Sequence, residues 1–380
     1  MADTLYFSRD SKVYIEALDP STGAPYSSSV VWEMPVLDGF SFSQATNTSE
    51  ITLNEMASTT GVSRRGRQMF TDSYAPAEWS FSTYARPFKS AGTGTGAADS
   101  AAKHHAVEEV LWAMMVGDAD YSSNTFTGFT HLDNDDEPLV YTGVEIDFDS
   151  SNKTTLGTCN LYFVLGGAGT GTKTIYKMAN CCVNEAGLDF DIDGITTINW
   201  SGMGTIISEE SSFPAATVFE AVTSTGNFIR NRLTSLTAVS TAPTSTTYSL
   251  VLTGGSVTIS NNMTFLTPET LGTINQPLGH VTGTRTVSGS FTCYLNADSN
   301  SSADLFENLI EGTTTITNDF NLLFKVGGTA APRLELQMTH CHLEVPSHGI
   351  DDIISLETAF HALPSAINET DEIIIKYVGA

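Results

Sequence analysis

Apolar and polar residues alternate at every second position along much of the chain, which is the period of a half-buried β-strand. In residues 161–207, an apolar strand, a Gly-Gly turn, an alternating strand, a Gly break and a final alternating strand follow one another. The same order returns from Leu322 onward. Because short strands separated by glycine turns are typical of all-β domains, the chain is predicted to be mainly β and to contain one unit twice.

Strand patterns in the earlier parts of the two halves also match. The stretch 79–84 returns as 289–294, and the apolar pair at the ends of 40–42 returns at the ends of 257–259. All four stretches have the alternation of half-buried strands. Two further segments are predicted to be matching edge strands: Leu5–Ile15 and Asn227–Thr237.

One helix is predicted in each half, where apolar residues recur at spacings of three and four. The first helix is expected to include Val107 as its first apolar residue and to end at Gly117. The second is expected to begin at Ser301 or Ser302 and to stop at Gly312. Each repeated unit therefore combines β-strands with one helix.

The length of the chain also favours two domains, because a single hydrophobic core stops growing well below 380 residues. The predicted first unit is 1–207, the linker is 208–226 and the second unit is 227–380. The first unit is longer than the second, and its extra residues fall in stretches rich in Gly, Ser, Thr, Asn or Asp. Such stretches are typical of loops, where insertions are tolerated.

The charge of the chain excludes most nucleic-acid readers. Asp and Glu number 43 against 17 Lys and Arg, which gives a formal net charge of −26. Binding to phosphates or anionic membranes depends on clustered basic residues, so such a surface repels both. The sequence has no run of eighteen apolar residues and no signal-peptide pattern, which predicts a soluble protein made in the cytoplasm.

The cysteines form an odd set without a CxxC pair, so they are predicted to be free thiols inside strands. They are Cys159, Cys181, Cys182, Cys293 and Cys341.

Four stretches, with their echoes in the other half, carry a resemblance that covers most of the chain. They are Trp32-Glu-Met-Pro-Val-Leu-Asp-Gly-Phe-Ser-Phe-Ser-Gln-Ala-Thr, Gly283-Thr-Arg-Thr-Val-Ser-Gly-Ser-Phe-Thr-Cys-Tyr-Leu, Leu322-Leu-Phe-Lys-Val-Gly-Gly, and His342-Leu-Glu-Val-Pro with Ile353-Ile-Ser-Leu-Glu-Thr. In their order, and in the helix between strands, they resemble the tail tube proteins of long-tailed bacteriophages. The resemblance implies two tandem β-sandwich or barrel units, each flanked by one helix.

The same resemblance implies that six such units form a ring, that rings stack into a tube, and that inner sheets line a channel. With two units per chain, a homotrimeric, pseudo-hexameric ring is expected. The implied function is structural: an acidic channel through which viral DNA is ejected without specific binding. The expected partners are further copies of the chain, the tail tip or baseplate, the tail terminator, the tape-measure protein and, in a contractile tail, a sheath. The protein is expected in the virion tail after assembly in the bacterial host cytoplasm, with no membrane partner.

Assembly is expected to depend on two loops, Ala57–Ala75 and Thr273–Thr286, which occupy the place of the family's ring-to-ring loop. The first contains a basic cluster on an otherwise acidic chain, and the second contains one arginine. Such residues could bind the carboxylates of a neighbouring ring, and a solvated basic loop is the equally weighted alternative. The candidate assembly residues are Arg64, Arg65, Arg67 and Arg285.

The acidic residues alternate with apolar ones in two places, which puts carboxylates on one strand face. Asp147 and Asp149 form the first set, and Asp189, Asp191 and Asp193 form the second. The channel and the outer surface both stay open as locations. The outer surface or a ring contact is favoured for the second set.

No cofactor, resident metal or enzymatic activity is predicted. Gly166–Lys173 resembles a phosphate loop, but Thr172 separates Gly171 from Lys173 and a strand follows. Asp189–Gly194 matches half of a calcium loop, whose twelfth position should be Glu but is Trp200.

The most metal-like pattern is His340, His342 and Glu344 on one strand face, with His348 nearby. A structural polar face is preferred there over a zinc site. No Gly-x-Ser-x-Gly elbow or HExxH pair occurs.

Two other classes of protein are weighed against a tube. The first is a tail-tip or adhesin-like protein that binds receptors or glycans through aromatic residues in loops. Here most aromatic residues lie in alternating strands and are predicted to be core. The second is a hydrolase with two carboxylates in one cleft, a geometry that sequence alone does not reveal.

Overall fold

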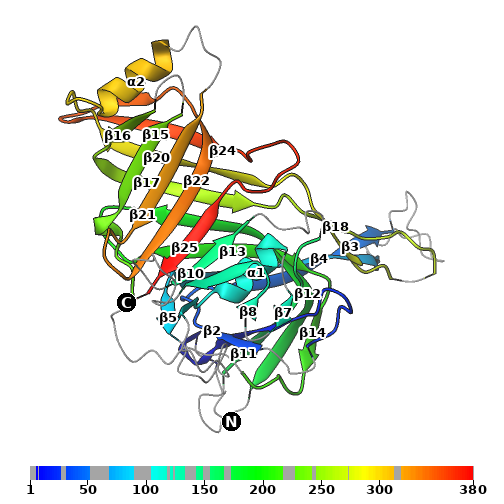
Figure 1. Ribbon diagram of the computed structural model, residues 1–380. Helices are drawn as coiled ribbons and strands as arrows, with labels where there is room; N and C mark the ends of the chain where they lie inside the picture. The colour runs from blue at the N-terminus through cyan, green and yellow to red at the C-terminus, as the bar shows by residue number, and fades with distance from the viewer. Residues whose placement is uncertain are drawn as a thin grey trace.

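The computed structural model describes residues 6, 8–26, 31–51, 68–89, 104–117, 120–122, 125–132, 143–148, 155–166, 173–216, 227–241, 245–272, 274–311 and 318–379. The fold is mainly β, as predicted, and most strands join one hydrogen-bonded network (Figure 1).

One continuous sheet, here called the shared sheet, runs through both halves of the chain by antiparallel pairing. Its strands follow one another in space in this order: β3 (Ser41–Glu50), β4 (Met69–Tyr84), β13 (Thr197–Gly204), the second part of β12 (Thr174–Phe190), β17 (Leu252–Ser260), β20 (Thr286–Tyr294), β24 (Ile354–Ala362) and β23 (Ser347–Ile350).

Further strands cover the buried face of the shared sheet. In the first half they are β2 (Val31–Met34), β1 (Lys12–Ala17), β11 (Cys159–Leu165), β14 (Ile207–Glu210), β9 (Phe129–Leu132) and β10 (Gly143–Asp147). In the second half they are β25 (Ile374–Val378), β22 (Arg333–Leu343), β21 (Phe320–Val326), β15 (Ser235–Ser240) and β16 (Thr246–Ser249). Three small ribbons complete the β-structure: β5 (Pro87–Lys89) with β6 (His104–Ala106), β7 (Tyr121–Ser122) with β8 (Thr125–Phe126), and β18 (Thr264–Leu266) with β19 (Gly279–Val281).

The two halves pair their strands in the same order. The series β1, β11, β12 in the first half corresponds to β15, β21, β22 in the second, and β3, β4, β13 corresponds to β17, β20, β24. The register shifts at the same place in both, after Cys159 and after Phe320. The two series of strands therefore share their pairing order and the place of one bulge, and the duplication itself stays a prediction.

The registers adjust one predicted alignment. Phe42 lies opposite Trp79, and Val257 lies opposite Gly289. When 79 and 289 are taken as matched positions, as predicted, Phe42 corresponds to Val257, two residues away from the predicted match with Ile259. Alternation alone does not detect such a shift, because it keeps every side chain on the same face.

Two strand pairings cross the predicted domain boundary. β12 pairs with β17, and β25 lies between β10 of the first half and β22 of the second. The largest buried hydrophobic cluster accordingly contains residues of both halves. The division into 1–207, 208–226 and 227–380 stays a prediction, and any such units share their core.

Both predicted helices are present, but they differ in environment. α2 (Ser302–Glu311) lies over the second half as expected, with Leu305 buried and Ile310 exposed. α1 (Glu109–Val116) ends at Gly117, whose φ of 93° is the left-handed conformation that favours glycine. Every residue of α1 is buried, so the expectation that it flanks the unit is wrong.

Aromatic and hydroxyl contacts hold α1 inside the core. The Trp112 ring meets Trp200 of β13 edge to face, with 4.6 Å between ring centroids. Its Nε1 donates to the Tyr377 hydroxyl of β25 at 2.9 Å, and that hydroxyl in turn donates to Glu108. α1 therefore connects the shared sheet to the strands that cover it.

Two expectations about edges and loops are also wrong. β1 pairs with both β2 and β11, and β15 pairs with both β16 and β21, so neither is an edge strand. β4 begins at Met69, within a stretch predicted to be loop. Two short helices of the 3-10 type, Ser8–Asp10 and Asn231–Leu233, were not predicted. The cysteines are buried free thiols, as expected.

Candidate functional surfaces

One face of the shared sheet is lined by short hydroxyl side chains. Alternate residues of a strand point to opposite sides, so the other face carries the buried aromatic residues, among them Trp79, Phe81 and Phe291. The hydroxyl residues are exposed or half-buried and come from both halves: Ser43, Ser80, Ser82, Ser201, Ser256, Thr258, Ser288, Ser290 and Ser355.

The fixed charges on this polar face all have one sign, and His361 of β24 adds an exposed imidazole. Glu78, Glu185, Asp189 and Glu357 are exposed on it. Neither lysine nor arginine occurs in β3, β4, β13, β17, β20, β23 or β24, nor in residues 178–190 of β12. The face is therefore hydroxyl-rich and acidic, with no fixed cation contributed by its own strands.

The two acidic sets predicted from alternation are not alike. Asp189 points to the polar face of the shared sheet, whereas Asp191 and Asp193 lie in the exposed turn after β12. Asp147 lies in β10, and Asp149 is outside the described residues. The outer-surface or ring-contact location favoured for the second set stays a prediction.

The shared sheet ends in two open edges. Among the described residues, β3 pairs with β4 alone and β23 pairs with β24 alone. Every residue of β23 is exposed, and most of β3 is exposed as well. An edge strand presents unpaired backbone N–H and C=O groups, which can pair with a strand of another chain.

A projecting arm extends from the body of the molecule. It consists of 46–51, 68–75, 264–272 and 274–281, and Figure 1 shows β3, β4 and β18 reaching outward together. The Tyr74 backbone N–H donates to the Asn275 carbonyl at 2.9 Å, which ties segments of the two halves to each other.

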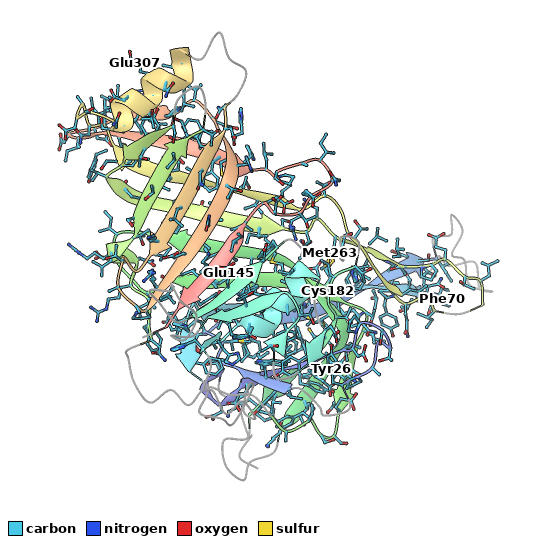
Figure 2. The ribbon with its side chains drawn as sticks, viewed as in Figure 1. Tyr26, Phe70, Glu145, Cys182, Met263 and Glu307 are labelled. Atoms are coloured by element: carbon cyan, nitrogen blue, oxygen red, sulfur yellow. The ribbon has the colours of Figure 1, made fainter. Side chains whose placement is uncertain are left out.

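The arm exposes many large apolar side chains, which is typical of a surface that contacts a partner. Leu271 is fully exposed and Leu278 is 73% exposed. The others that are exposed are Ile51, Met69, Phe70, Leu266, Ile274 and Val281. Figure 2 shows the Phe70 side chain on the arm, away from the body. Such a surface suits a protein interface.

Of the four predicted assembly arginines, the structure describes only Arg285. Arg64, Arg65 and Arg67 lie between β3 and β4, outside the described residues. Arg285 pairs with Glu372, with 2.7 Å between Nη2 and Oε2, and both side chains are at most 10% exposed. Its guanidinium also donates to the carbonyls of Phe148 and Thr370. These contacts fix the loop before β25, and the assembly role of Arg285 stays a prediction.

The predicted histidine and acidic groups have separate partners. His340 lies 3.2 Å from Asp319, and His361 lies 3.4 Å from Glu344. The His348 ring packs edge to face on Phe306. In the calcium-like stretch, Asp193 pairs with Arg232 at 3.0 Å. Gly166 and Lys173 are described, but 167–172 between them are not.

Sequence reasoning missed two features. The open edges depend on which strands pair, and no local pattern records that. The second feature is a buried group of His105, Glu109 and His131. The spacing of His105 and Glu109, four residues apart at a helix start, was an available signal for that pair. His131 lies far along the chain and gave none.

The open edges and the apolar arm suit a structural protein that contacts other chains, and comparison with known proteins gives the class. Residues 36–362 match the family described as phage tail tube protein, so the chain belongs to that family. It is also similar to tail tube protein pb6 of Escherichia phage T5, with 29% identity over 379 residues, covering 97% of this chain and 75% of that protein. The protein is therefore a structural component of the virion tail, as predicted.

In the part of the chain that the structure describes, no helix is both long and apolar enough to cross a membrane.

Proposed function

We propose that three chains close into a pseudo-hexameric ring, that the polar face of the shared sheet lines its channel, and that the arm joins successive rings. The observation that carries the proposal is the β12–β17 junction. This junction connects two similarly ordered sets of strands within one chain. In the matched order, β23 corresponds to the second part of β12 and β3 corresponds to β17. These two strands are the open edges of the shared sheet.

The observed registers give the contact between chains a definite alignment. When Phe81 and Phe291 are taken as matched positions, Ser347 corresponds to Gly187 and Ser43 corresponds to Thr258. Gly187 and Thr258 lie opposite each other in the junction within the chain. In the ring, Ser347 of one chain therefore faces Ser43 of the next. A head-to-tail contact of this kind closes into a ring when the rotation from one chain to the next is a whole fraction of a full turn.

The composition of the polar face suits a channel for DNA. Each lysine or arginine that neutralises a phosphate releases counterions and so strengthens binding. A wall of hydroxyl groups and carboxylates lacks those groups, so DNA is expected to pass without being retained. Because charges are screened over about 8 to 10 Å at ordinary salt, the carboxylates act mainly close to the wall.

The apolar side chains of the arm support its role in stacking. Burying one exposed leucine stabilises an interface by about 1.5–3 kcal/mol, and every chain of a ring contributes its own arm. The basic cluster Arg64, Arg65 and Arg67 lies in the segment that links β3 to β4, where it would add ion pairs with the next ring. The tail tip or baseplate, the tail terminator, the tape-measure protein and any sheath are the further partners of such a tube.

Electron microscopy of the purified protein at high concentration, with sedimentation mass, tests the proposed ring. We expect hollow rings or tubes with three chains in each layer. Six chains in each layer would contradict the use of both halves as ring units. A monomer that stays monomeric even when tail-tip components are added would contradict self-assembly.

Stacking of rings is expected to fail in either of two variants. One is Leu271→Asp with Leu278→Asp, which places charges on the apolar arm. The other is the triple change of Arg64, Arg65 and Arg67 to Glu, which reverses the basic cluster. Both should fold with an unchanged circular dichroism spectrum and form single rings, seen by electron microscopy. Ile192→Asp, at an exposed apolar position away from the arm, is the control, and normal tube length in the arm variants would remove the stacking role.

A further inference from the structure

Three side chains with metal-ligating atoms meet in the interior of the first half. His105 Nδ1 lies 2.9 Å from Glu109 Oε2, and His131 Nε2 lies 3.8 Å from Glu109 Oε1. One ligand atom from each residue lies within 4.8 Å of the others. The three come from β6, the first residue of α1 and β9, so the fold rather than local sequence brings them together.

The hydrogen bonding of His131 aims one of its nitrogens at this group. Its Nδ1 lies 2.8 Å from the backbone carbonyl of His104, an atom that only accepts. His131 Nδ1 therefore carries the proton, and in the neutral ring Nε2 holds a lone pair directed at Glu109. Metal-binding histidines have the same arrangement, because a hydrogen bond to the far nitrogen fixes the tautomer and the ring plane.

The group is buried, yet two of its polar atoms lack hydrogen bonds. The side chains of His105 and Glu109 are each 1% exposed, and that of His131 is 4% exposed. Among the described residues, His105 Nε2 and Glu109 Oε1 have no hydrogen-bond partner. A buried polar atom without a partner costs about 1–3 kcal/mol, so a cation that engages Glu109 Oε1, which lies 3.8 Å from His131 Nε2, is favoured.

The donor set selects the class of ion. Two imidazoles and one carboxylate suit first-row transition metals, whereas Ca²⁺ and Mg²⁺ prefer oxygen ligands throughout. In a tetrahedral zinc site with bonds of about 2.0–2.2 Å, ligand atoms lie roughly 3.3–3.6 Å apart. His105 Nδ1 and His131 Nε2 lie 2.9 and 3.8 Å from the two different oxygens of Glu109. One ligand atom of each residue lies within 4.8 Å of the others, so side-chain movement would bring the three onto one ion.

We propose that His105, Glu109 and His131 bind one Zn²⁺ ion, with a water molecule as the fourth ligand. The ion would hold β6 and β9 against the start of α1. Because the ion would join three separate elements of the fold, its proposed role is to hold them together. It revises the expectation that the chain has no resident metal, at residues other than the His340 cluster considered from the sequence.

A proton is the competing occupant. A protonated His105 would form an ion pair with Glu109 without any metal, and the pKa of Glu109 is lowered, against the raising effect of its burial, by His105, hydrogen bonding and His131. Close by, the neighbouring Glu108 accepts a hydrogen bond from Tyr377, and the Phe88 ring stacks on His105. Metal content separates the two explanations, because the protonated pair excludes a bound cation.

The test uses the full chain without an affinity tag, purified from medium containing zinc. We expect about one zinc per chain by elemental analysis after dialysis, and a thermal midpoint that falls by several degrees when a strong chelator removes the metal and recovers with added zinc. Replacement with Co²⁺ should give the intense visible absorption of a tetrahedral site.

The variants Glu109→Gln and His131→Gln should each lose the metal, while His342→Gln, at an exposed histidine, should keep it. If a site variant fails to fold, the zinc content and cobalt spectrum of the unmodified chain still decide. Absence of zinc from the unmodified chain, with no thermal response to added zinc, would overturn the proposal and leave the hydrogen-bonded pair as the explanation.

Discussion

Chains that carry Ser43→Cys together with Ser347→Cys are expected to become covalently linked trimers when assembled and oxidised. In the proposed ring, these two positions face each other between neighbouring chains, as Gly187 and Thr258 do within one chain. Directly opposite residues on paired strands have Cβ atoms about 4.5–5.5 Å apart, close enough for a disulfide after slight adjustment. Denaturing electrophoresis without reductant should show a three-chain band that disappears with reductant.

The native cysteines do not compete in this reaction. All are buried, and burial raises the pKa of Cys293 to about 11 and that of Cys341 to about 12. The reactive form is the thiolate, so these groups stay inert near neutral pH. Each engineered cysteine alone should leave the chains unlinked.

The matched control is Ser43→Cys with His348→Cys, because neighbouring residues on a strand point to opposite faces. This pair should link poorly. Equal linking in both pairs would contradict the proposed register, and a ladder ending at six chains would contradict the trimer.

Placing lysines on the polar face should leave the tube intact and make it retain DNA. Ser80→Lys and Ser290→Lys put one cation on each half of the shared sheet, at positions that are half-buried before assembly. Each new phosphate contact adds about 0.9 to the slope of log affinity against log salt, so many contacts along a tube bind strongly at low salt. We expect a fall of at least tenfold in plaque titre of phage carrying the variant, with normal tails by electron microscopy.

Ser80→Gln with Ser290→Gln is the control, since glutamine adds comparable length without charge. Its titre should be near normal. Retention of DNA by purified lysine tubes should weaken as salt rises. A lysine variant with unchanged titre and no DNA retention would show that this face does not line the channel.

Much of the fold could be predicted because its local signals agree with its global arrangement. Phe81 and Phe291 alternate with polar neighbours because one side of their strands is core. Gly117 ends α1 because the chain needs a left-handed residue there. These features depend on a few adjacent residues, and a sequence records them directly.

The wrong predictions share a physical cause, since each depends on what packs on the second side of an element. β4 was expected to begin late because Met69 to Asp72 are exposed on both faces, so the alternation that marks a strand is missing. α1 was expected to flank the unit, but Trp112 meets Trp200 on one side and Tyr377 on another. Apolar spacing shows one helix face and does not show how many faces are covered.

Candidate functional residues could be predicted when they are adjacent in the sequence and could not when the fold brings them together. The basic cluster Arg64, Arg65 and Arg67 could be found because its members are adjacent, and its role is still a prediction. The group formed by His105 and His131 could not be found, since the two histidines lie on separate strands, β6 and β9, and only the tertiary fold brings their rings together.

The last strand of the described chain, β25, is a neighbour of strands in both halves. Translation releases β25 after every other described strand, yet this strand supplies the neighbour of β10 in the first half and of β22 in the second. Tyr377 also completes the surroundings of α1. A chain without β25 would leave β10 and β22 each short of one neighbouring strand, so the cores of both halves are completed by the same segment.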